Sequence, residues 1–224
     1  MRGIVTGASR GLGLALTRAL VERGWQLIVD ARDREALDRA VAGLPGVVAI
    51  GGDIADPEHR RRLVDTAGRP LDLLVNNASA LGPTPLPELA RYPLEELRRV
   101  YEVNVIAPLA LTQLALPRFG DAARVVNVIS DAAVEAYEGW GGYGSSKAAL
   151  AQLSAILAAE RPLLRTYAVD PGDMRTQMQQ DAFPGEDISD RPPPDESVPG
   201  LLALIEGELP SGRYRARDLS PTRA

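Results

Sequence analysis

Residues 3 to 13 read Gly3-Ile4-Val5-Thr6-Gly7-Ala8-Ser9-Arg10-Gly11-Leu12-Gly13, and this stretch carries the strongest structural signal in the sequence. Its apolar start predicts a short β-strand at Gly3–Val5, and the apolar stripe of residues 11–24 predicts an amphipathic helix. Glycines at such a junction let the backbone turn tightly and approach a pyrophosphate, and the N-terminus of a helix favours negative charge. The spacing G-x-x-x-G-x-G lacks the Lys-Ser/Thr ending of a P-loop, so it indicates a dinucleotide rather than a nucleoside triphosphate.

Short β-rich runs alternate with helical runs along the rest of the chain. The further predicted strands are Gln26–Asp30, Gly46–Gly51, Leu71–Asn76, Arg124–Ser130, Leu163–Asp170 and Gly212–Ala216, and the further predicted helices are 34–42, 57–67, 94–117, 143–160 and 197–207. The predicted strands Leu71–Asn76 and Arg124–Ser130 are mostly apolar, which is typical of strands buried on both faces by helices. The pattern predicts a single α/β domain over residues 1–217, with a Rossmann-type doubly wound parallel sheet of about seven strands, followed by a short tail at 218–224.

Composition excludes several kinds of chemistry. The 224 residues contain no cysteine and one histidine, His59, which argues against disulfides, thiolate metal sites, a His-rich metal site and a Ser/His/Asp triad. A net charge of −5 without a basic block argues against nucleic acid or an anionic membrane as a partner. No run of eighteen apolar residues and no signal sequence stand out, so we expect a cytoplasmic protein without a membrane span or a metal.

One segment breaks the alternation of strands and helices. Residues 175–199 contain six residues that are proline or glycine, and many that are acidic. Their apolar residues follow neither a helical nor a strand period. Long loops inside a compact domain are usually functional or disordered, and this one follows a strand at the edge where α/β proteins bind ligands. We interpret it as a substrate-covering lid, with a featureless linker as the alternative.

The only lysine in the chain, Lys147, stands four residues after Tyr143 on the predicted helix 143–160. Residues at this spacing share a helix face, and an ammonium beside a phenol lowers the pKa of the phenol. A tyrosine tuned in this way transfers a proton near neutral pH. Ser130, at the end of a predicted strand, can donate a hydrogen bond to a carbonyl oxygen as charge develops on it. The alternatives to these chemical roles are that Tyr143 and Lys147 are an ordinary pair on the surface of the helix and that Ser130 only caps a helix or a turn.

Charges after the second strand bear on the choice of dinucleotide. NAD sites place a carboxylate on the ribose 2′-hydroxyl, and NADP sites place arginines on the 2′-phosphate. The strand ends Val29-Asp30-Ala31-Arg32, and Arg10 lies in the glycine loop. The register that puts Ala31 at the ribose position predicts NADP(H), through Arg10 and Arg32. One alternative is an NAD site in which Asp30 binds the ribose. The other is that Arg10 and Arg32 are solvated surface charges that contact no cofactor.

The motifs together resemble the classical short-chain dehydrogenase/reductase family over about residues 3–217. Thr6–Gly13 resembles its T-G-x-x-x-G-x-G, Tyr143–Lys147 its Y-x-x-x-K, Asn76–Ser79 its N-N-A-G and Asp170–Thr176 its P-G motif. The resemblance implies four catalytic residues, namely Asn104, Ser130, Tyr143 and Lys147. It implies cofactor contacts from Gly7, Ser9, Arg10, Gly11, Leu12, Gly13, Arg32, Asp53, Ile54, Asn77, Ala78, Tyr143, Lys147, Pro171, Gly172, Met174 and Thr176.

The predicted reaction is reversible hydride transfer between NADP(H) and a small carbonyl or alcohol substrate. The resemblance implies that Tyr143 is the acid/base, Ser130 binds the carbonyl and Asn104 holds a water. It also implies a homodimer through the helices 94–117 and 143–160, whereas the missing D-G-G after the last strand leaves a tetramer open. Alternatives are an NAD-dependent alcohol dehydrogenase and a non-catalytic dinucleotide sensor or scaffold. The residues predicted to line a partly hydrophobic substrate pocket are Tyr137, Trp140, Met174, Met178 and Phe183.

Overall fold

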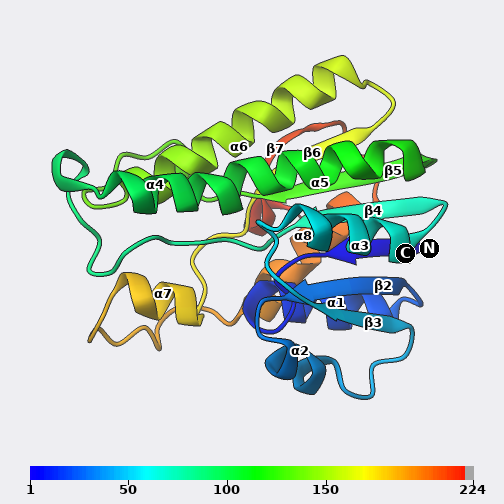
Figure 1. Cartoon of the computed structure of the whole chain (residues 1–224), viewed down its shortest axis with the longest axis horizontal. Helices are drawn as coiled ribbons and strands as arrows, with labels where there is room; N and C mark the ends of the chain where they lie inside the picture. Colours follow the sequence, from blue (N-terminus) through cyan, green and yellow to red (C-terminus); the bar gives the residue numbers. More distant parts are fainter. Residues whose placement is uncertain (220–224) are drawn as a thin grey trace.

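Seven parallel strands form one sheet in the order β3-β2-β1-β4-β5-β6-β7 in the computed structural model, which describes residues 1–219 (Figure 1). The strands are β1 (Arg2–Val5), β2 (Gln26–Ala31), β3 (Val47–Gly51), β4 (Leu71–Asn76), β5 (Phe119–Val128), β6 (Arg165–Asp170) and β7 (Gly212–Arg215). The strand order reverses between β1 and β4, which is the topological switch point where such sheets bind ligands. The predicted Rossmann-type sheet is confirmed. The predicted tail lies outside the described residues from residue 220 onward.

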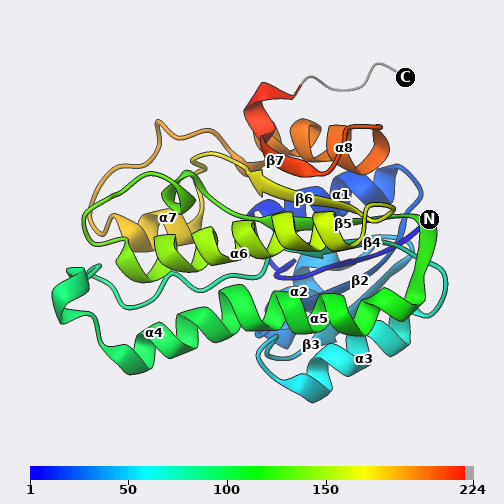
Figure 2. The same cartoon turned by 90° about the horizontal axis from the view of Figure 1, so that it is seen from above.

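Helices cover both faces of the sheet, as Figure 2 shows from above. One face is packed by α1 (Gly11–Glu22), α2 (Arg34–Val41) and α8 (Val198–Glu206), and the other by α3 (Pro57–Ala67), α5 (Ala107–Ala115) and α6 (Gly141–Glu160). The strands alternate between the two cores, so Val29 and Ala31 of β2 face α1 and α2 whereas Ile28 faces α3. The same alternation turns Asp30 toward α3.

The helix predicted at 94–117 is interrupted by a π-helical turn. Helix α4 (Leu94–Tyr101) continues through the π turn at Glu102–Ile106 into α5, and the whole run continues to Arg118. This run is long and apolar enough to cross a membrane by length and composition alone. Here its apolar side is part of the core, because Ala107, Leu111 and Ala115 are fully buried beside β4 and β5. The π turn contains Asn104, and such turns are frequent at functional sites.

The segment 175–199 has more regular structure than the sequence predicted. It contains the short helix α7 (Gln177–Ala182) and a 3₁₀ turn at Pro194–Ser197 that leads into α8. The Thr176 side chain caps α7 by accepting from the amide of Gln179. Figure 2 shows α7 beside the N-terminal end of α6, beyond the strands. The segment interpreted as a lid therefore contains a helix and a 3₁₀ turn, and it follows β6 at the carboxyl edge of the sheet as expected. Strand β5 also begins five residues earlier than predicted, at Phe119.

Candidate active site

The glycine loop between β1 and α1 has a backbone that only glycine adopts easily. Gly7 and Gly11 have φ angles of +69° and +58°, and a Cβ on Gly7 would lie 2.9 Å from the Cα of Ala78. A Cβ on Gly13 would overlap the carbonyl oxygen of Gly7 and the side chain of Asn77. Gly13 therefore brings helix α1 close to the loop, and its contact with a cofactor stays a prediction.

The N-terminus of α1 is open to an anion. Arg10 is the N-cap residue and, among the described residues, its side chain makes no capping hydrogen bond, nor is any first-turn residue acidic. The first amide groups of a helix have no partners within the helix, so they are available to a bound phosphate. These features fit the pyrophosphate of a dinucleotide.

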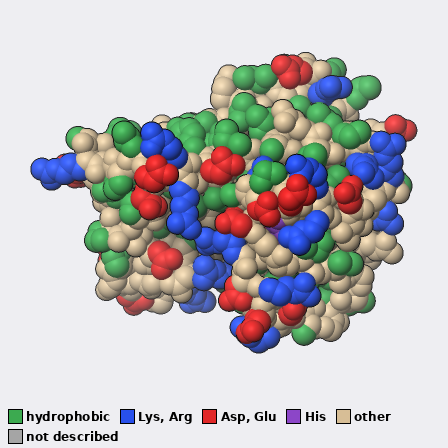
Figure 3. Space-filling model, viewed as in Figure 1, with side chains coloured by type: hydrophobic (Ala, Val, Ile, Leu, Met, Phe, Trp, Pro, Cys, Tyr) green, Lys and Arg blue, Asp and Glu red, His purple; other side chains and the backbone are tan. Residues whose placement is uncertain are grey.

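A cavity of about 1030 Å³ runs along the carboxyl edge of the sheet. Every predicted cofactor residue except Gly13 lines it, together with Ser130 and with residues that the sequence analysis did not single out, including Arg18, Arg99, Asp131, Arg175, Gln177, Gln179, Arg191 and Asp195. Basic side chains gather near the middle of the molecular face shown in Figure 3, with acidic side chains on either side. The cavity wall contains the arginines 10, 18, 32, 99, 175 and 191, which suits a ligand with several phosphates.

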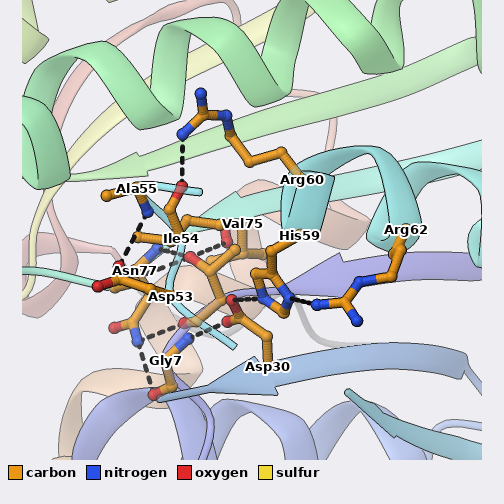
Figure 4. Close-up of polar contacts among 12 residues, drawn as sticks. Gly7, Asp30, Asp53, Ile54, Ala55, His59, Arg60, Arg62, Val75 and Asn77 are labelled. Carbon is orange, nitrogen blue, oxygen red and sulfur yellow. Dashed lines mark hydrogen bonds and ion pairs between the residues drawn. The ribbon is translucent and has the colours of Figure 1, made fainter. Parts of the chain in front are cut away.

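Asp30 reaches this cavity, but both of its carboxylate oxygens are bound by the protein (Figure 4). Its Oδ1 accepts from the Gly7 amide at 2.8 Å, and its Oδ2 lies 2.9 Å from Nε2 of His59. The residue is 1% exposed. Arg10 and Arg32, in contrast, are exposed where they line the cavity.

Tyr143 and Lys147 lie one turn apart on α6 and both line the cavity. The Nζ atom of Lys147 is 5.5 Å from the centre of the Tyr143 ring and donates to the Val128 carbonyl oxygen at 2.8 Å. Burial lowers the pKa of Lys147 to about 7. Burial also raises the pKa of Tyr143, more than its hydrogen bonds with the hydroxyls of Ser79 and Ser130 lower it. The pKa of Tyr143 is thus shifted upward, opposite to the direction that the sequence predicted, because desolvation is the largest cause and the carboxylates of Asp131 and Asp170 add to it.

Ser130 lines the cavity and caps a turn, so its alternative role as a capping residue is confirmed, while its hydrogen bond to a substrate carbonyl stays a prediction. Its hydroxyl lines the cavity, and it also caps the 3₁₀ turn at Asp131–Ala133 by accepting from the amide of Ala132 at 3.2 Å. The same hydroxyl donates to Asp131 at 2.9 Å, and Asp131 accepts from the Tyr137 hydroxyl at 2.9 Å. Burial raises the pKa of Asp131, but the hydrogen bonds from Ser130, Tyr137 and the Ala132 amide outweigh it, so the net shift is downward. The only sequence signal for Asp131 was its place next to Ser130.

Asn104 is fully buried behind the cavity wall. Its amide nitrogen donates to the Ala80 carbonyl and to the Ser146 hydroxyl, both at 2.9 Å. Its amide oxygen accepts from the Ala80 amide at 2.8 Å and from the Ser79 hydroxyl at 3.2 Å. All four hydrogen-bonding positions of the side chain are used by protein groups, and the role of Asn104 in holding a relay water stays a prediction. Its role in the structure is to hold the segment 79–80 beside Tyr143.

The five residues predicted for a partly hydrophobic pocket, namely Tyr137, Trp140, Met174, Met178 and Phe183, all line the cavity. The Trp140 ring contacts three other aromatic rings, at centroid distances of 5.6 Å to Tyr143, 6.0 Å to Phe183 and 6.4 Å to Tyr137. We call Tyr137, Trp140 and Phe183 the aromatic wall. It joins the end of α7 to the start of α6 beside Tyr143. Within residues 1–219, no three His, Cys, Asp or Glu side chains gather as a metal site would require.

Comparison with known proteins places this site in a family. The family described as short chain dehydrogenase matches residues 3–187. The chain is 35% identical over 189 residues to 1-deoxy-11-beta-hydroxypentalenate dehydrogenase of Streptomyces exfoliatus, covering 79% of this chain and 68% of that protein. It is 33% identical over 184 residues to L-xylulose reductase of Homo sapiens, covering 80% of this chain and 74% of that protein.

Solved structures agree with this result. A short-chain dehydrogenase of Pseudomonas syringae superimposes on this chain with a TM-score of 0.88 at 30% sequence identity. The match covers 96% of this chain and 94% of the Pseudomonas syringae chain. A short-chain dehydrogenase of Shigella flexneri, solved in complex with NADP, has a TM-score of 0.87 at 27% identity and covers 96% of each chain. The sheet order, the glycine loop and the Tyr143–Lys147 pair agree with these matches, and the chain therefore belongs to the short-chain dehydrogenase/reductase family of NAD(P)-dependent oxidoreductases, which act on carbonyl and alcohol groups.

Proposed function

We propose that the protein transfers a hydride between NADP(H) and a carbonyl or alcohol substrate, with Tyr143 as the acid/base. The observation that carries this proposal is the composition of one continuous cavity. Tyr143, Lys147 and Ser130 line it together with Arg10 and Arg32, while Asp30 keeps both carboxylate oxygens on protein donors. A carboxylate occupied in this way is a poor acceptor for a ribose hydroxyl, so the arrangement favours a 2′-phosphate on the arginines.

The nicotinamide, when bound, supplies or accepts the hydride, and the chain binds and orients it. Amide groups of the glycine loop and the N-terminus of α1 would hold the pyrophosphate, and Arg10 and Arg32 would hold the 2′-phosphate. Among the cavity-lining residues, Asp53 and Ile54 would contact the adenine, and residues from Pro171 to Thr176 would contact the nicotinamide. The NADP found in the Shigella flexneri relative supports this assignment.

Tyr143 handles the proton. Its phenol carries a proton at neutral pH and is the group that would donate it to a carbonyl oxygen, although burial, by raising its pKa, weakens it as an acid. Ser130 donates to the same oxygen after its hydroxyl leaves Asp131. The pKa of Lys147, about 7, lets this residue exchange a proton near neutral pH behind the tyrosine. Asn104 acts indirectly, by fixing Ser79 and Ala80.

The aromatic wall and Met178 favour a substrate with a sizeable apolar or aromatic group next to its carbonyl. Arg191, 5.6 Å from the centre of the Phe183 ring, adds a cation near the open side of this region. Relatives such as L-xylulose reductase act on small carbonyl compounds, which supports a carbonyl substrate of modest size.

Replacement of Tyr143 by Phe tests the proposal. With a panel of aldehydes and ketones, NADPH consumption by Tyr143→Phe should fall by about a hundredfold to ten-thousandfold, because the general acid is lost. Its Kd for NADPH should stay within about threefold, since only one hydroxyl is removed. Tyr214→Phe is the matched control, because the Tyr214 hydroxyl bonds Pro210 away from the cavity. Full activity in Tyr143→Phe would overturn the mechanism, and NADPH binding without turnover by the unaltered protein would favour the sensor alternative.

A further inference from the structure

The only histidine of the chain is fully buried on α3, beneath the adenosine end of the cavity (Figure 4). Nε2 of His59 lies 2.9 Å from Oδ2 of Asp30, and Nη2 of Arg62 lies 3.3 Å from Nδ1 of His59. A guanidinium has only donors, so Nδ1 accepts from Arg62 and the hydrogen of the imidazole is on Nε2. His59 therefore donates a hydrogen bond to Asp30.

Asp30 connects this histidine to the glycine loop. Its other oxygen accepts from the amide of Gly7, the first glycine of the loop, at 2.8 Å. The carboxylate thus has one donor from α3 and one from the loop, and both oxygens of this buried group are satisfied. Figure 4 shows the two contacts on opposite sides of the carboxylate.

The neighbouring backbone leaves room for the imidazole. A Cβ on Gly52, directly after β3, would overlap the His59 ring. Arg60, the next residue of α3, is held elsewhere, because its Nη1 donates to the Ile54 carbonyl at 2.6 Å. Among the described residues, the side-chain donor that reaches Asp30 at hydrogen-bond distance is His59. The position of the carboxylate therefore depends on His59.

We propose that His59 is a positioning residue that sets the preference between NADP(H) and NAD(H). By holding Oδ2 of Asp30, it keeps that carboxylate directed into the protein, so that the ribose end of the cavity presents Arg10 and Arg32 rather than Asp30. The inference rests on the proposed function, in which the adenosine 2′-phosphate binds at that end.

Loss of the His59 donor leaves Oδ2 buried without a partner. The carboxylate then turns toward the cavity, whose wall it already forms in part. There it accepts from the 2′-hydroxyl of NADH and repels the 2′-phosphate of NADPH. The ratio of Kd for NADH to Kd for NADPH should consequently change, whereas a general loss of binding would weaken both cofactors by the same factor.

Two variants at the same position separate these effects. The amide nitrogen of glutamine extends about as far as Nε2 of histidine, so His59→Gln keeps a donor for Asp30, whereas the shorter asparagine in His59→Asn does not reach it. Isothermal titration of the full-length protein with NADPH and with NADH gives the ratio of Kd for NADH to Kd for NADPH, without any substrate. We expect this ratio to fall about tenfold or more in His59→Asn and to stay within about twofold of the original value in His59→Gln.

A purely structural role gives a different result. If His59 only stabilises the fold, both cofactors weaken equally in His59→Asn, the ratio stays constant, and the inference is overturned. The double variant Asp30→Asn/His59→Asn removes the charge as well, so its ratio should return toward the original value. A double variant whose ratio stays as low as that of His59→Asn also contradicts the inference, because the carboxylate would then not be the cause.

Asp30→Asn alone tests the inference even if His59→Asn does not fold. With His59 in place, the carboxylate does not contact the cofactor, so the ratio of Kd for NADH to Kd for NADPH should remain within about twofold of the original value, even if the acceptor lost to Gly7 or His59 weakens both cofactors alike. A selective loss of NADH affinity would mean that Asp30 already binds the ribose, which overturns the inference. Failure of the proposed function looks different: an unaltered protein that prefers NADH overturns the cofactor assignment and this inference together, whereas an NADPH preference that His59→Asn leaves unchanged overturns this inference alone.

Discussion

The Nζ atom of Lys147 lies 5.5 Å from the centre of the Tyr143 ring and donates to the main-chain carbonyl of Val128 at 2.8 Å. Both side chains are buried, so desolvation favours the neutral form of each: it raises the pKa of Tyr143 and lowers that of Lys147 to about 7. The site therefore holds a protonated phenol beside a lysine whose pKa lies near neutral pH.

The shifted pKa of Lys147 makes the stability of the protein depend on pH. Its pKa is lower in the folded than in the unfolded chain, so between about pH 7 and 10 the unfolded chain binds more protons and the free energy of unfolding rises with pH. The expected rise from pH 7 to pH 9 is about 2 kcal/mol, measured by urea unfolding. Lys147→Met should lose this rise, and an equal rise in that variant would assign it to another group. Above about pH 10 the raised pKa of Tyr143 acts in the opposite direction.

Lys147→Arg should lower kcat/KM for carbonyl reduction by about a hundredfold or more. The ammonium is 2% exposed and bonds one carbonyl oxygen, and a larger guanidinium that cannot lose its charge does not fit that place. The comparison is Arg98→Lys on the exposed side of α4, which should retain full activity. A rate for Lys147→Arg close to that of the unaltered protein would show that any cation serves.

Arg32→Ala should raise the Kd for NADPH by about tenfold to a hundredfold, because a charge-assisted bond to the 2′-phosphate is lost. The Kd for NADH should change by less than about twofold, since that dinucleotide has no 2′-phosphate. Arg39→Ala, an exposed arginine of α2 that pairs with Glu35, is the matched control. Equal weakening of both cofactors by Arg32→Ala would contradict the assignment of this arginine.

Phe183→Ala should raise KM for ketones that carry an aromatic ring by about tenfold, because part of the aromatic wall is removed. KM for a small aliphatic ketone, and kcat for both substrates, should change little. Leu163→Ala, at a position 88% exposed, controls for the loss of apolar surface. If KM rises equally for both ketones, Phe183 shapes the lid and does not contact the substrate.

Local patterns were sufficient to predict most of the architecture. The sheet follows from short apolar strands alternating with amphipathic helices, and the glycine loop is recognisable because a tight turn restricts which residues fit at Gly7 and Gly11. Tyr143 and Lys147 were predictable as a pair because helix geometry brings positions four apart onto one face. The short helix α7 was missed because its six residues have too little periodicity to be distinguished from a loop.

The order of strands and helices, the glycine loop and the tyrosine–lysine pair can all be predicted from local sequence, because each depends on neighbours within one or two turns of chain. Tertiary structure alone decided three other features: that Asp30 is bound by His59, that the Asn104 side chain is saturated by protein groups, and that burial governs the two pKa values. Each of these depends on contacts between residues far apart in the chain and on the exclusion of water, and no local pattern specifies which side chains meet or how deeply they are buried.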